Sequence, residues 1–386
     1  MRVAIVGVGN CASALVQGIA IAKAYHRKLE GVTFEDIGGY KPRDIDIVAC
    51  FDVDERKVNL KLKDAIFAEP NCCMNLLKYD EINFIDHVVV QKTKVLDGVA
   101  PHMLEHPKGF KVDFEKEELK SYQVRQILRE RKVDVLINYL PVGSQVATEY
   151  WANICIDTKI AFCNCIPVFI ASNPEWEQKF IRAGLPLIGD DMRSQFGASV
   201  LSQMLQELAF DRGHKVKAHI QQNVGGNTDF LNMVDRSRLK SKKISKENVI
   251  RAQNVLRSIS DKDSFLFAGP SDFIEHYGDN KIATFRLELE GFGGAPVTLD
   301  AKLSVQDSPN SAGVVIDAIR FLKVAREMGV VGSLRGASAF TQKTPPEQLT
   351  FADARYECNK LAHREITERM ITITELAELC PSSDST

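Results

Sequence analysis

The sequence predicts an α/β protein in which a parallel, doubly wound sheet carries an inserted α+β unit. Two observations lead to this fold class. Over roughly the first 190 residues, short apolar runs alternate with helical patterns, which is typical of strands buried on both faces of a parallel sheet. Between about residues 215 and 305, polar and apolar residues alternate instead, which indicates half-exposed antiparallel strands.

The composition excludes several classes of protein. A length of 386 residues suggests two or three domains, and 45% hydrophobic with 26% charged residues is ordinary for a globular chain. The formal net charge of −2 gives no long-range attraction to nucleic acid or to an anionic membrane. Without a run of 18 apolar residues or a signal-peptide pattern, we expect a cytoplasmic protein that does not contact a membrane.

The nine cysteines do not indicate a disulfide framework or a structural zinc site, because they include no C-x-x-C pair. Cys163 and Cys165 are two residues apart on a predicted strand, so we expect their side chains to point to opposite faces. We interpret them as small buried hydrophobic residues of a reducing compartment.

The first element is a buried strand that runs directly into a glycine turn and a helix. The apolar run from Val3 to Val6 ends in Gly7-x-Gly9-x-x-Ala12, where a helical pattern begins. Gly7 permits a tight turn, Gly9 lets the backbone approach a pyrophosphate, and Ala12 allows close helix packing. The arrangement predicts a Rossmann dinucleotide-binding unit, with a glycine turn that binds no ligand as the alternative.

The second predicted strand, residues 45–51, ends in Asp52-Val53-Asp54. An acidic residue at this point usually binds the adenosine ribose and would repel a 2′-phosphate, so Asp52 favours NAD over NADP. The distance from the glycines is about twice the usual ~20 residues, which we attribute to an inserted polar loop over residues 27–43. As an alternative, either aspartate could be a helix N-cap.

Further strands at residues 88–90, 133–137, 160–166 and 185–188, and a charged helix near 114–131, continue the alternating pattern. Ligands of doubly wound sheets bind beyond the carboxyl ends of the strands. The loop from Asn138 to Ser144 is therefore a candidate cofactor wall. We predict a dinucleotide-binding domain over residues 1–192.

The second predicted domain covers residues 193–306, with strands at 215–223, 281–290 and 296–305 around a polar stretch. The next helix carries an apolar face and ends at Gly329. We expect residues 307–380 to pack back on the first domain, and residues 381–386 to be a disordered tail.

Four polar clusters lie where a packed core would not place them, at residues 189–195, 223–229, 241–246 and 307–310. Each has a structural alternative, as a helix cap, a turn or a solvated helix face. The sequence contains no G-x-S-x-G, H-E-x-x-H or Walker motif, and its histidines lack ligand spacing. Lysines are therefore the better candidates for acid–base work.

Lys242 and Lys246 are four residues apart, so on a helix their ammonium groups would repel each other unless an anion or carboxylates lie between them. Such a face suits a phosphate. Asp191, Asp229 and Asp307 could keep neighbouring lysines charged or adjust one of them for proton transfer.

These motifs together resemble those of the inositol-1-phosphate synthases (myo-inositol-1-phosphate synthases) of the shorter prokaryotic type. The match extends over nearly the whole chain, through Gly7–Ser13, Phe51–Asp54, Leu140–Ser144, Asn223–Asn227, Ser241–Lys246, Gly269–Asp272 and Asp307–Gly313.

The resemblance implies conversion of D-glucose 6-phosphate to 1L-myo-inositol 1-phosphate with NAD. In that chemistry the sugar is oxidised at C5, enolised, closed by an aldol step between C6 and C1, and reduced again, without net redox change. The developing oxyanions need fixed cations and the phosphate needs an anion pocket. Two alternatives remain open: a two-domain NAD-dependent dehydrogenase of a phosphorylated substrate, and a non-catalytic NAD-binding sensor.

Residue roles follow from the resemblance alone. Lys242 matches the family lysine at the C5 oxygen, Lys246 the one near the phosphate, Lys281 a third, and Lys343 the one near the C1 oxygen. The matching active-site carboxylates are Asp191, Asp229 and Asp307. Implied cofactor contacts are Gly7, Gly9, Asn10, Cys11, Ala12, Asp52, Asn138, Leu140, Pro141, Ser144, Asp190 and Ser308. Implied substrate contacts are Ser194, Gln195, Asn223, Gly226, Asn227 and Asn232.

One departure concerns Arg193, where the family carries lysine. A guanidinium does not readily release a proton, so we expect an electrostatic role there rather than an acid–base one. The resemblance further implies a homotetramer assembled through the sheet of the second domain. It also implies a divalent or monovalent cation near the nicotinamide, and the sequence does not determine which of the two.

Overall fold

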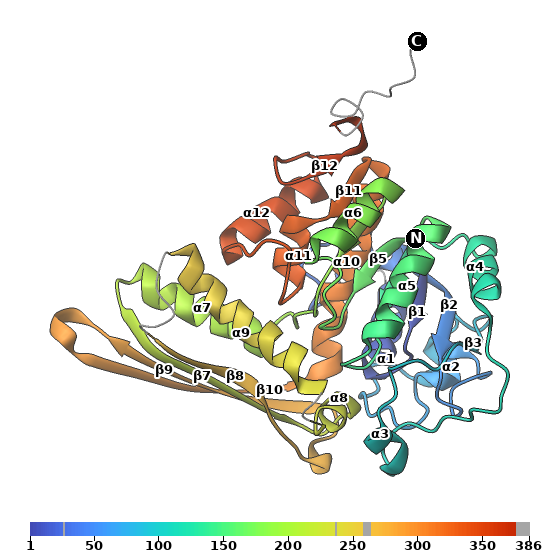
Figure 1. The fold of residues 1–386 in the computed structure, drawn as a ribbon, viewed down its shortest axis with the longest axis horizontal. Coiled ribbons are helices and arrows are strands. Elements are labelled where there is room, and N and C mark those ends of the chain that lie inside the picture. The colour runs from blue at the N-terminus through green and yellow to red at the C-terminus, as the bar shows by residue number, and fades with distance from the viewer. Residues whose placement is uncertain (26–27, 236–237, 258–263, 376–386) are drawn as a thin grey trace.

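The computed structural model describes residues 1–25, 28–235, 238–257 and 264–375, which form two lobes (Figure 1). The larger lobe is built on an eight-stranded sheet in the order β12-β11-β6-β5-β4-β1-β2-β3. Its strands are β1 (Arg2–Val6), β2 (Asp46–Asp52), β3 (Val90–Lys92), β4 (Val135–Asn138), β5 (Ala161–Asn164), β6 (Pro186–Ile188), β11 (Val330–Ser333) and β12 (Ile371–Thr372).

Every pairing in this sheet is parallel except that of β12 with β11. Along β1, Val3 and Ile5 pack into one apolar core and Ala4 and Val6 into another. Alternate residues are buried on opposite faces, which is why the strand reads as a continuous apolar run. The predicted doubly wound parallel sheet is confirmed.

Helices cover both faces of the large sheet. One core includes side chains of α1 and α10, and the other includes side chains of α4, α5 and α6. The helices of this lobe are α1 (Asn10–Tyr25), α2 (Leu62–Ala65), α3 (Pro101–Glu105), α4 (Ser121–Glu130), α5 (Gln145–Thr158), α6 (Pro174–Ala183), α10 (Asp307–Glu327), α11 (Arg335–Thr341) and α12 (Phe351–Ala362).

The smaller lobe contains a four-stranded sheet in the order β10-β9-β7-β8. Its elements are α7 (Ala198–Asp211), β7 (Lys215–Gly225), α8 (Thr228–Asn232), α9 (Leu239–Leu256), β8 (Phe265–Phe273), β9 (Asn280–Glu290) and β10 (Pro296–Gln306). β9 pairs antiparallel with β7 and β10, as predicted, whereas β7 and β8 are parallel. Strand β8 was not predicted, because it follows the polar stretch after β7. That stretch contains α9, which connects β7 to β8 and carries few apolar residues.

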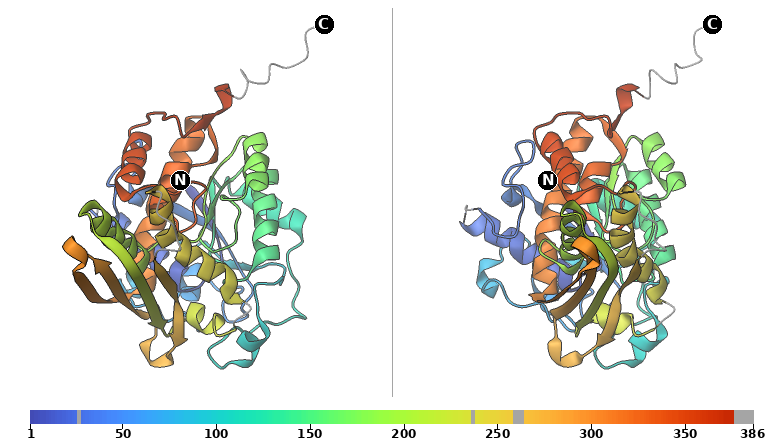
Figure 2. Two further views of the ribbon diagram at one scale, coloured as in Figure 1. Left: turned by 60° about the vertical axis from the view of Figure 1, so that its left-hand side comes forward. Right: turned by 90° about the vertical axis from the view of Figure 1, so that its left-hand side faces the viewer.

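Helices α7 and α9 lie side by side against one face of the small sheet (Figures 1 and 2). In the part of the chain that the structure describes, no helix covers the other face. The outer strand β10 is exposed along most of its length. The smaller lobe therefore presents a broad strand surface away from the helices.

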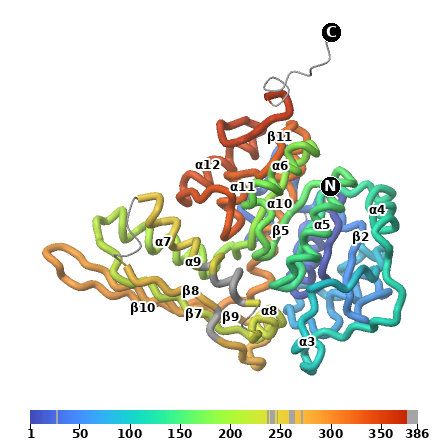
Figure 3. Tube along the Cα trace, viewed as in Figure 1, coloured from blue at the N-terminus to red at the C-terminus, as the bar shows by residue number. Residues whose placement is uncertain are grey.

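Helix α10 returns the chain from the small sheet to the large one, as the trace in Figure 3 shows. It packs against α1, β5 and β6, so the expectation that it returns to the first domain is confirmed. Within α10, Asp317 and Arg320 form an ion pair whose side chains are both 0% exposed. Arg320 also donates to the Phe34 carbonyl at 2.8 Å, which ties α10 to the loop after α1.

Two local expectations were wrong. The charged helix begins only at Ser121, because the preceding residues form a loop. The Sγ atoms of Cys163 and Cys165 lie 3.7 Å apart rather than on opposite faces. The reason is that β5 ends at Asn164, so the alternation of strand faces does not reach Cys165.

None of the helices described is both long and apolar enough to cross a membrane. The predicted tail, residues 381–386, lies outside the described residues.

The buried pair on α10 gives a stability prediction. Replacing Arg320 by Met should lower the free energy of unfolding by about 3–5 kcal/mol, because Asp317 would keep a buried, uncompensated charge. Denaturant unfolding measures the change. Arg125→Met is the control. Arg125 forms an ion pair with Asp157, and the side chains of the two residues are 30% and 45% exposed. Such a surface pair contributes about 0–1 kcal/mol. Equal effects of the two substitutions would contradict the prediction.

Candidate active site at the junction of the two lobes

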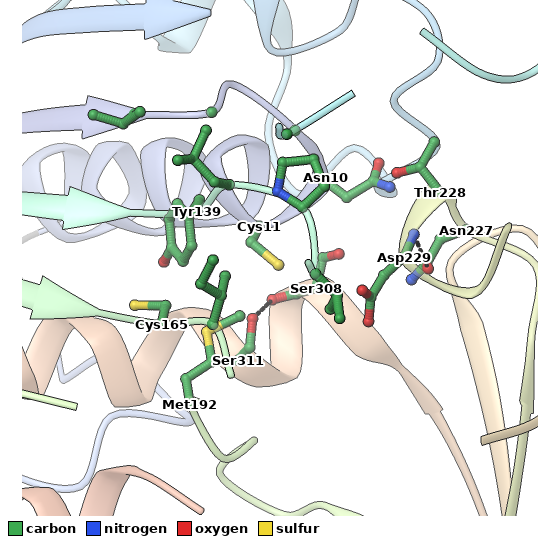
Figure 4. Close-up of a pocket in the computed structure, with 18 of the residues that line it drawn as sticks. Asn10, Cys11, Tyr139, Cys165, Met192, Asn227, Thr228, Asp229, Ser308 and Ser311 are labelled. Carbon is green, nitrogen blue, oxygen red and sulfur yellow. Dashed lines mark hydrogen bonds between the residues drawn. The ribbon is translucent and has the colours of Figure 1, made fainter. Parts of the chain in front are cut away.

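A cavity lies where the carboxyl ends of the large-sheet strands meet the smaller lobe. The large lobe lines it with residues at or just beyond the ends of β1, β2, β4, β5 and β6. The smaller lobe contributes residues from β7, α8 and β9, and α10 contributes its first turn. In Figure 4, Asn10 and Cys11 at the start of α1 lie near Asn227 to Asp229 of α8 and Ser308 and Ser311 of α10.

The glycine turn fits a dinucleotide. Gly7 has φ +88°, and a Cβ there would lie 2.6 Å from the Tyr139 carbonyl oxygen, so only glycine fits. A Cβ on Gly9 would meet no protein atom within 4 Å. Since Gly9 lines the cavity at the N-terminus of α1, this space can admit a pyrophosphate. The buried Tyr139 hydroxyl, which has no hydrogen-bond partner in the described structure, also borders the cavity.

Asp52 lines the cavity at the end of β2 and also holds the glycine turn. Its Oδ2 accepts from the Val8 backbone N–H at 2.6 Å, and its Oδ1 accepts from the N–H groups of Val53 and Asp54 at 2.7 and 2.9 Å. Asp54 lies outside the cavity lining and pairs with Arg56 at 2.5 Å. Neither aspartate caps a helix, because the chain forms turns rather than a helix after β2.

Lys57 lines the same part of the cavity and was missed from the sequence. It is 3% exposed, and its Nζ donates to the Val8 carbonyl at 2.8 Å and to Asn71 Oδ1 at 2.9 Å. Burial lowers the pKa of its ammonium group, while the charge of Asp52 acts in the opposite direction. Nothing in the sequence marks this lysine, since lysines are almost always exposed.

A first lysine–carboxylate pair combines residues far apart in the sequence. Lys343 Nζ lies 2.8 Å from Asp191 Oδ1 and donates to the Met192 carbonyl at 2.7 Å. Asp191 is buried, and its Oδ2 accepts from Ser245 Oγ of α9 at 2.6 Å. Both Lys343 and Asp191 line the cavity.

A second pair comes from the smaller lobe and α10. Lys281 on β9 donates to Asp307, the first residue of α10, and both line the cavity. Asp229 borders the cavity from the first turn of α8. Asn227 caps that helix, since its Oδ1 accepts from the backbone N–H groups of Asp229 and Phe230 at 3.1 and 3.3 Å.

Lys242 and Lys246 lie on α9, but their side chains are outside the described part of the structure. Ser245, immediately before Lys246 and three residues after Lys242, reaches Asp191. The turn of α9 that contains Ser245 therefore contacts a residue that lines the cavity.

The structure brings most of the predicted residues to the cavity. The predicted residues that line it, among those that the structure describes, are Gly7, Gly9, Asn10, Cys11, Asp52, Leu140, Pro141, Asp191, Ser194, Asn223, Asn227, Asp229, Lys281, Asp307, Ser308 and Lys343. Seven predicted contacts lie outside the lining: Ala12, Asn138, Ser144, Asp190, Gln195, Gly226 and Asn232.

Asp190 and Asn138 belong to a buried network behind the cavity. The Asp190 carboxylate accepts from Asn164 Nδ2 at 2.7 Å and from four donors in residues 170–172. Burial raises its pKa to about 6. Asn138 Nδ2 donates to Asn164 Oδ1 at 2.9 Å. Both side chains hold strand-end loops in place rather than facing the cavity.

The other predicted contacts also bind within the protein. Ser144 Oγ donates to the Pro141 carbonyl, and Gln195 Oε1 accepts from Thr33 at 3.1 Å. Asn232 Nδ2 donates to the Val142 carbonyl at 2.9 Å. A Cβ on Gly226 would lie 2.4 Å from the Ile274 carbonyl oxygen, so this glycine permits a close backbone approach.

Arg193 is buried and lies outside the lining of the main cavity. Its Nε donates to the Gln342 carbonyl at 2.6 Å and its Nη1 donates to Gln203 on α7. Burial lowers the pKa of its guanidinium to about 10. Arg193 ties α7 to the segment that carries Lys343.

Comparison with known proteins identifies the family. The family model for myo-inositol-1-phosphate synthase matches residues 197–308. A Mycolicibacterium smegmatis protein named inositol-3-phosphate synthase is 43% identical over 92% of this chain and 96% of its own length. The chain belongs to the myo-inositol-1-phosphate synthase family.

Solved structures share the fold of this synthase-family protein. The structure of Ari2 is 31% identical and has a TM-score of 0.72, covering 94% of this chain and 98% of its own. A myo-inositol-1-phosphate synthase-related protein from Thermotoga maritima is 24% identical, with a TM-score of 0.74 over 95% of this chain and 99% of its own. The second likeness concerns the fold alone.

The open space at Gly9 gives a prediction about cofactor binding. Gly9→Val should weaken NAD⁺ binding at least about tenfold, or about 1.4 kcal/mol, because the new side chain would occupy the pyrophosphate position. Titration calorimetry measures the affinity. Circular dichroism should stay unchanged, since the added Cβ meets no protein atom. Unaltered NAD⁺ affinity would show that the dinucleotide binds elsewhere.

Proposed function

We propose that the chain converts D-glucose 6-phosphate to 1L-myo-inositol 1-phosphate, with NAD bound throughout, in inositol biosynthesis. The observation that carries the proposal is the presence of two lysine–carboxylate pairs, Lys281–Asp307 and Lys343–Asp191, in the same cavity as the glycine turn. A plain hydride transfer generates one developing oxyanion, whereas oxidation followed by an aldol closure generates oxyanions at two carbons. Two separately held ammonium groups suit the second reaction.

NAD bound at the glycine turn would accept a hydride from the sugar and later return it. Asp52 and the N-terminus of α1 would hold the dinucleotide. The carboxylates of Asp307 and Asp191 orient the Lys281 and Lys343 ammonium groups before the sugar arrives. Because these groups need no rearrangement during the reaction, each can stabilise negative charge on a sugar oxygen as it develops.

The substrate side of the proposal draws on the smaller lobe. Asn223 and Asp229 line the cavity from β7 and α8 and can bind sugar hydroxyl groups. By resemblance, Lys242 and Lys246 on α9 would supply the positive charge for the C5 oxygen and the phosphate.

The described residues contain no cluster of three or more His, Cys, Asp or Glu side chains that could hold a metal ion. We therefore assign no ligands to the cation that the resemblance implies.

We also propose a cytoplasmic location, which the absence of disulfides among the described cysteines supports.

Product analysis tests the function directly. Incubation with glucose 6-phosphate and NAD⁺ should yield inositol phosphate without accumulation of NADH. Steady growth of the reduced-nicotinamide absorbance would indicate a net dehydrogenase, and unchanged substrate would favour a non-catalytic NAD-binding protein.

The two paired lysines should each be needed for turnover. Lys281→Met and Lys343→Met should lower kcat about 10²–10³-fold, the usual effect of removing one oxyanion-stabilising donor. Steady-state product formation provides the measurement. Lys179→Met on the exposed side of α6 is the control, because Lys179 lies outside the cavity lining. A loss below threefold for both cavity variants would contradict the assigned roles.

We further propose a homotetramer assembled through the small sheet. Strand β10 is exposed and, among the described strands, pairs only with β9. It carries the exposed Val297 and Leu299, and Phe292 beside it is fully exposed. An exposed, unpaired edge with apolar residues is a surface that proteins usually cover.

Light scattering should therefore give a mass about four times the 43.1 kDa of the chain. Leu299→Glu should reduce that mass, because a charge would be buried at the contact. Val146→Glu, at an exposed position of α5, should leave it unchanged. A monomeric wild-type protein would refute the proposal.

A further inference from the structure

Asp279 is a buried carboxylate just behind the cavity, and the site described above gives it no role. It is 3% exposed, lies in the turn before β9, and is outside the cavity lining. Two residues further along the chain is Lys281. This closeness to Lys281 along the chain is the only feature of the sequence that points to Asp279.

The carboxylate joins three separate segments of the site. Its Oδ1 accepts from Asn227 Nδ2 at 3.1 Å and from Ser308 Oγ at 2.8 Å, and its Oδ2 accepts from the Ser308 backbone N–H at 3.1 Å. Its backbone carbonyl accepts from the Asp307 N–H at 2.9 Å. The cap of α8, the first turn of α10 and the start of β9 therefore meet at one side chain.

These contacts determine what Ser308 can offer to a bound molecule. A serine hydroxyl has one proton, and that of Ser308 is donated to Asp279. Its remaining lone pairs are acceptors, and Ser308 lines the cavity near Cys11 and Ser311 (Figure 4). An ionised Asp279 thus presents Ser308 to the cavity as a hydrogen-bond acceptor.

The same contacts hold Lys281. Asp279 fixes Asp307 through its backbone and fixes the first turn of α10 through Ser308, and Asp307 accepts from the Lys281 ammonium. The ammonium position therefore depends on the start of α10 being in place.

We propose that Asp279 is a positioning residue that couples the two halves of the site: its ionised carboxylate sets Ser308 as an acceptor and holds the Asp307–Lys281 pair in the cavity. The inference deepens the proposed function and rests on it.

Burial is the main cause of a raised pKa for Asp279, about 6, and the charge of Asp307 adds to the effect. Below this pH the carboxyl group carries a proton and can no longer accept from all three donors. Several titratable groups lie around it: Asp307 on α10, Lys281 on β9, Asp229 on α8, Cys11 on α1, and Cys72 and Cys73 in the loop beside α1.

The test compares the wild-type protein with Asp279→Asn. The asparagine has almost the same shape, but in either orientation of its amide the NH₂ group would face at least one of the donors of Asn227 and Ser308. At pH 7.5 and saturating substrate, kcat should fall about tenfold or more. The wild-type kcat should also fall as the pH decreases through about 6, and this part of the pH profile should be absent from the variant. The substrate phosphate and the surrounding groups titrate in both proteins, so the difference between the two profiles reports on Asp279.

Asp157→Asn is the matched control, because it makes the same chemical change at an exposed ion pair on α5. A double-mutant cycle with Ser308→Ala should be strongly non-additive if Asp279 acts through Ser308. An unchanged kcat and pH profile would overturn the proposal. So would a lower melting temperature with an unaltered acid limb, which is the result expected of a purely structural residue.

Cofactor affinity provides a readout that does not need turnover. Asp279→Asn should weaken NAD⁺ binding about threefold to tenfold in calorimetry, since Ser308 loses its fixed orientation. If wild-type protein forms no inositol phosphate, the proposed function fails, while the calorimetric difference still decides the role of Asp279. Equal affinities of the two proteins would then overturn it.

Discussion

The anchoring of helix α10 is the constraint on which the rest of the site depends. Its first turn is held by Asp279 through the N–H and hydroxyl of Ser308. Further along, the buried Asp317–Arg320 pair and the Phe34 carbonyl fix the helix to the larger lobe. Because α10 also packs against α1, the glycine turn that begins α1 and the Lys281–Asp307 pair have one defined separation. A dinucleotide and a sugar bound to the two lobes would therefore meet in a fixed geometry.

The electrostatics of the cavity depend on the pairing of Lys281 and Lys343 with one carboxylate each. An isolated ammonium group in a partly buried site would be costly to desolvate, and a carboxylate partner offsets that cost. Asp307 has a second stabilising influence, because it begins α10, where the helix dipole favours negative charge. The two pairs carry no net charge, so a phosphate group needs further cations. The four-residue spacing of Lys242 and Lys246 on α9 is suited to that need.

Prediction from the sequence succeeded where a local pattern was sufficient. The buried strand β1, the glycine turn and the return of α10 were all correct, because strand burial and helix amphipathicity leave periodic signals. Strand β8 was missed and its parallel pairing with β7 was not foreseen, since register and strand direction depend on partners distant in the sequence. Cys165 was misplaced because the end of a strand is hard to locate from composition alone.

For the site, the sequence by itself determined which chemical groups are available: the glycine turn, the lysines and the aspartates. The resemblance to a family extended this to their roles. Only the tertiary structure decided that Asp191 belongs with Lys343 and Asp307 with Lys281, and that Asp190, Asn138 and Arg193 support the site from behind it. It alone showed Lys57 and Asp279, whose importance comes from burial. The physical reason is that a residue type fixes charge and hydrogen-bonding capacity, whereas burial and pairing arise only when distant segments pack together.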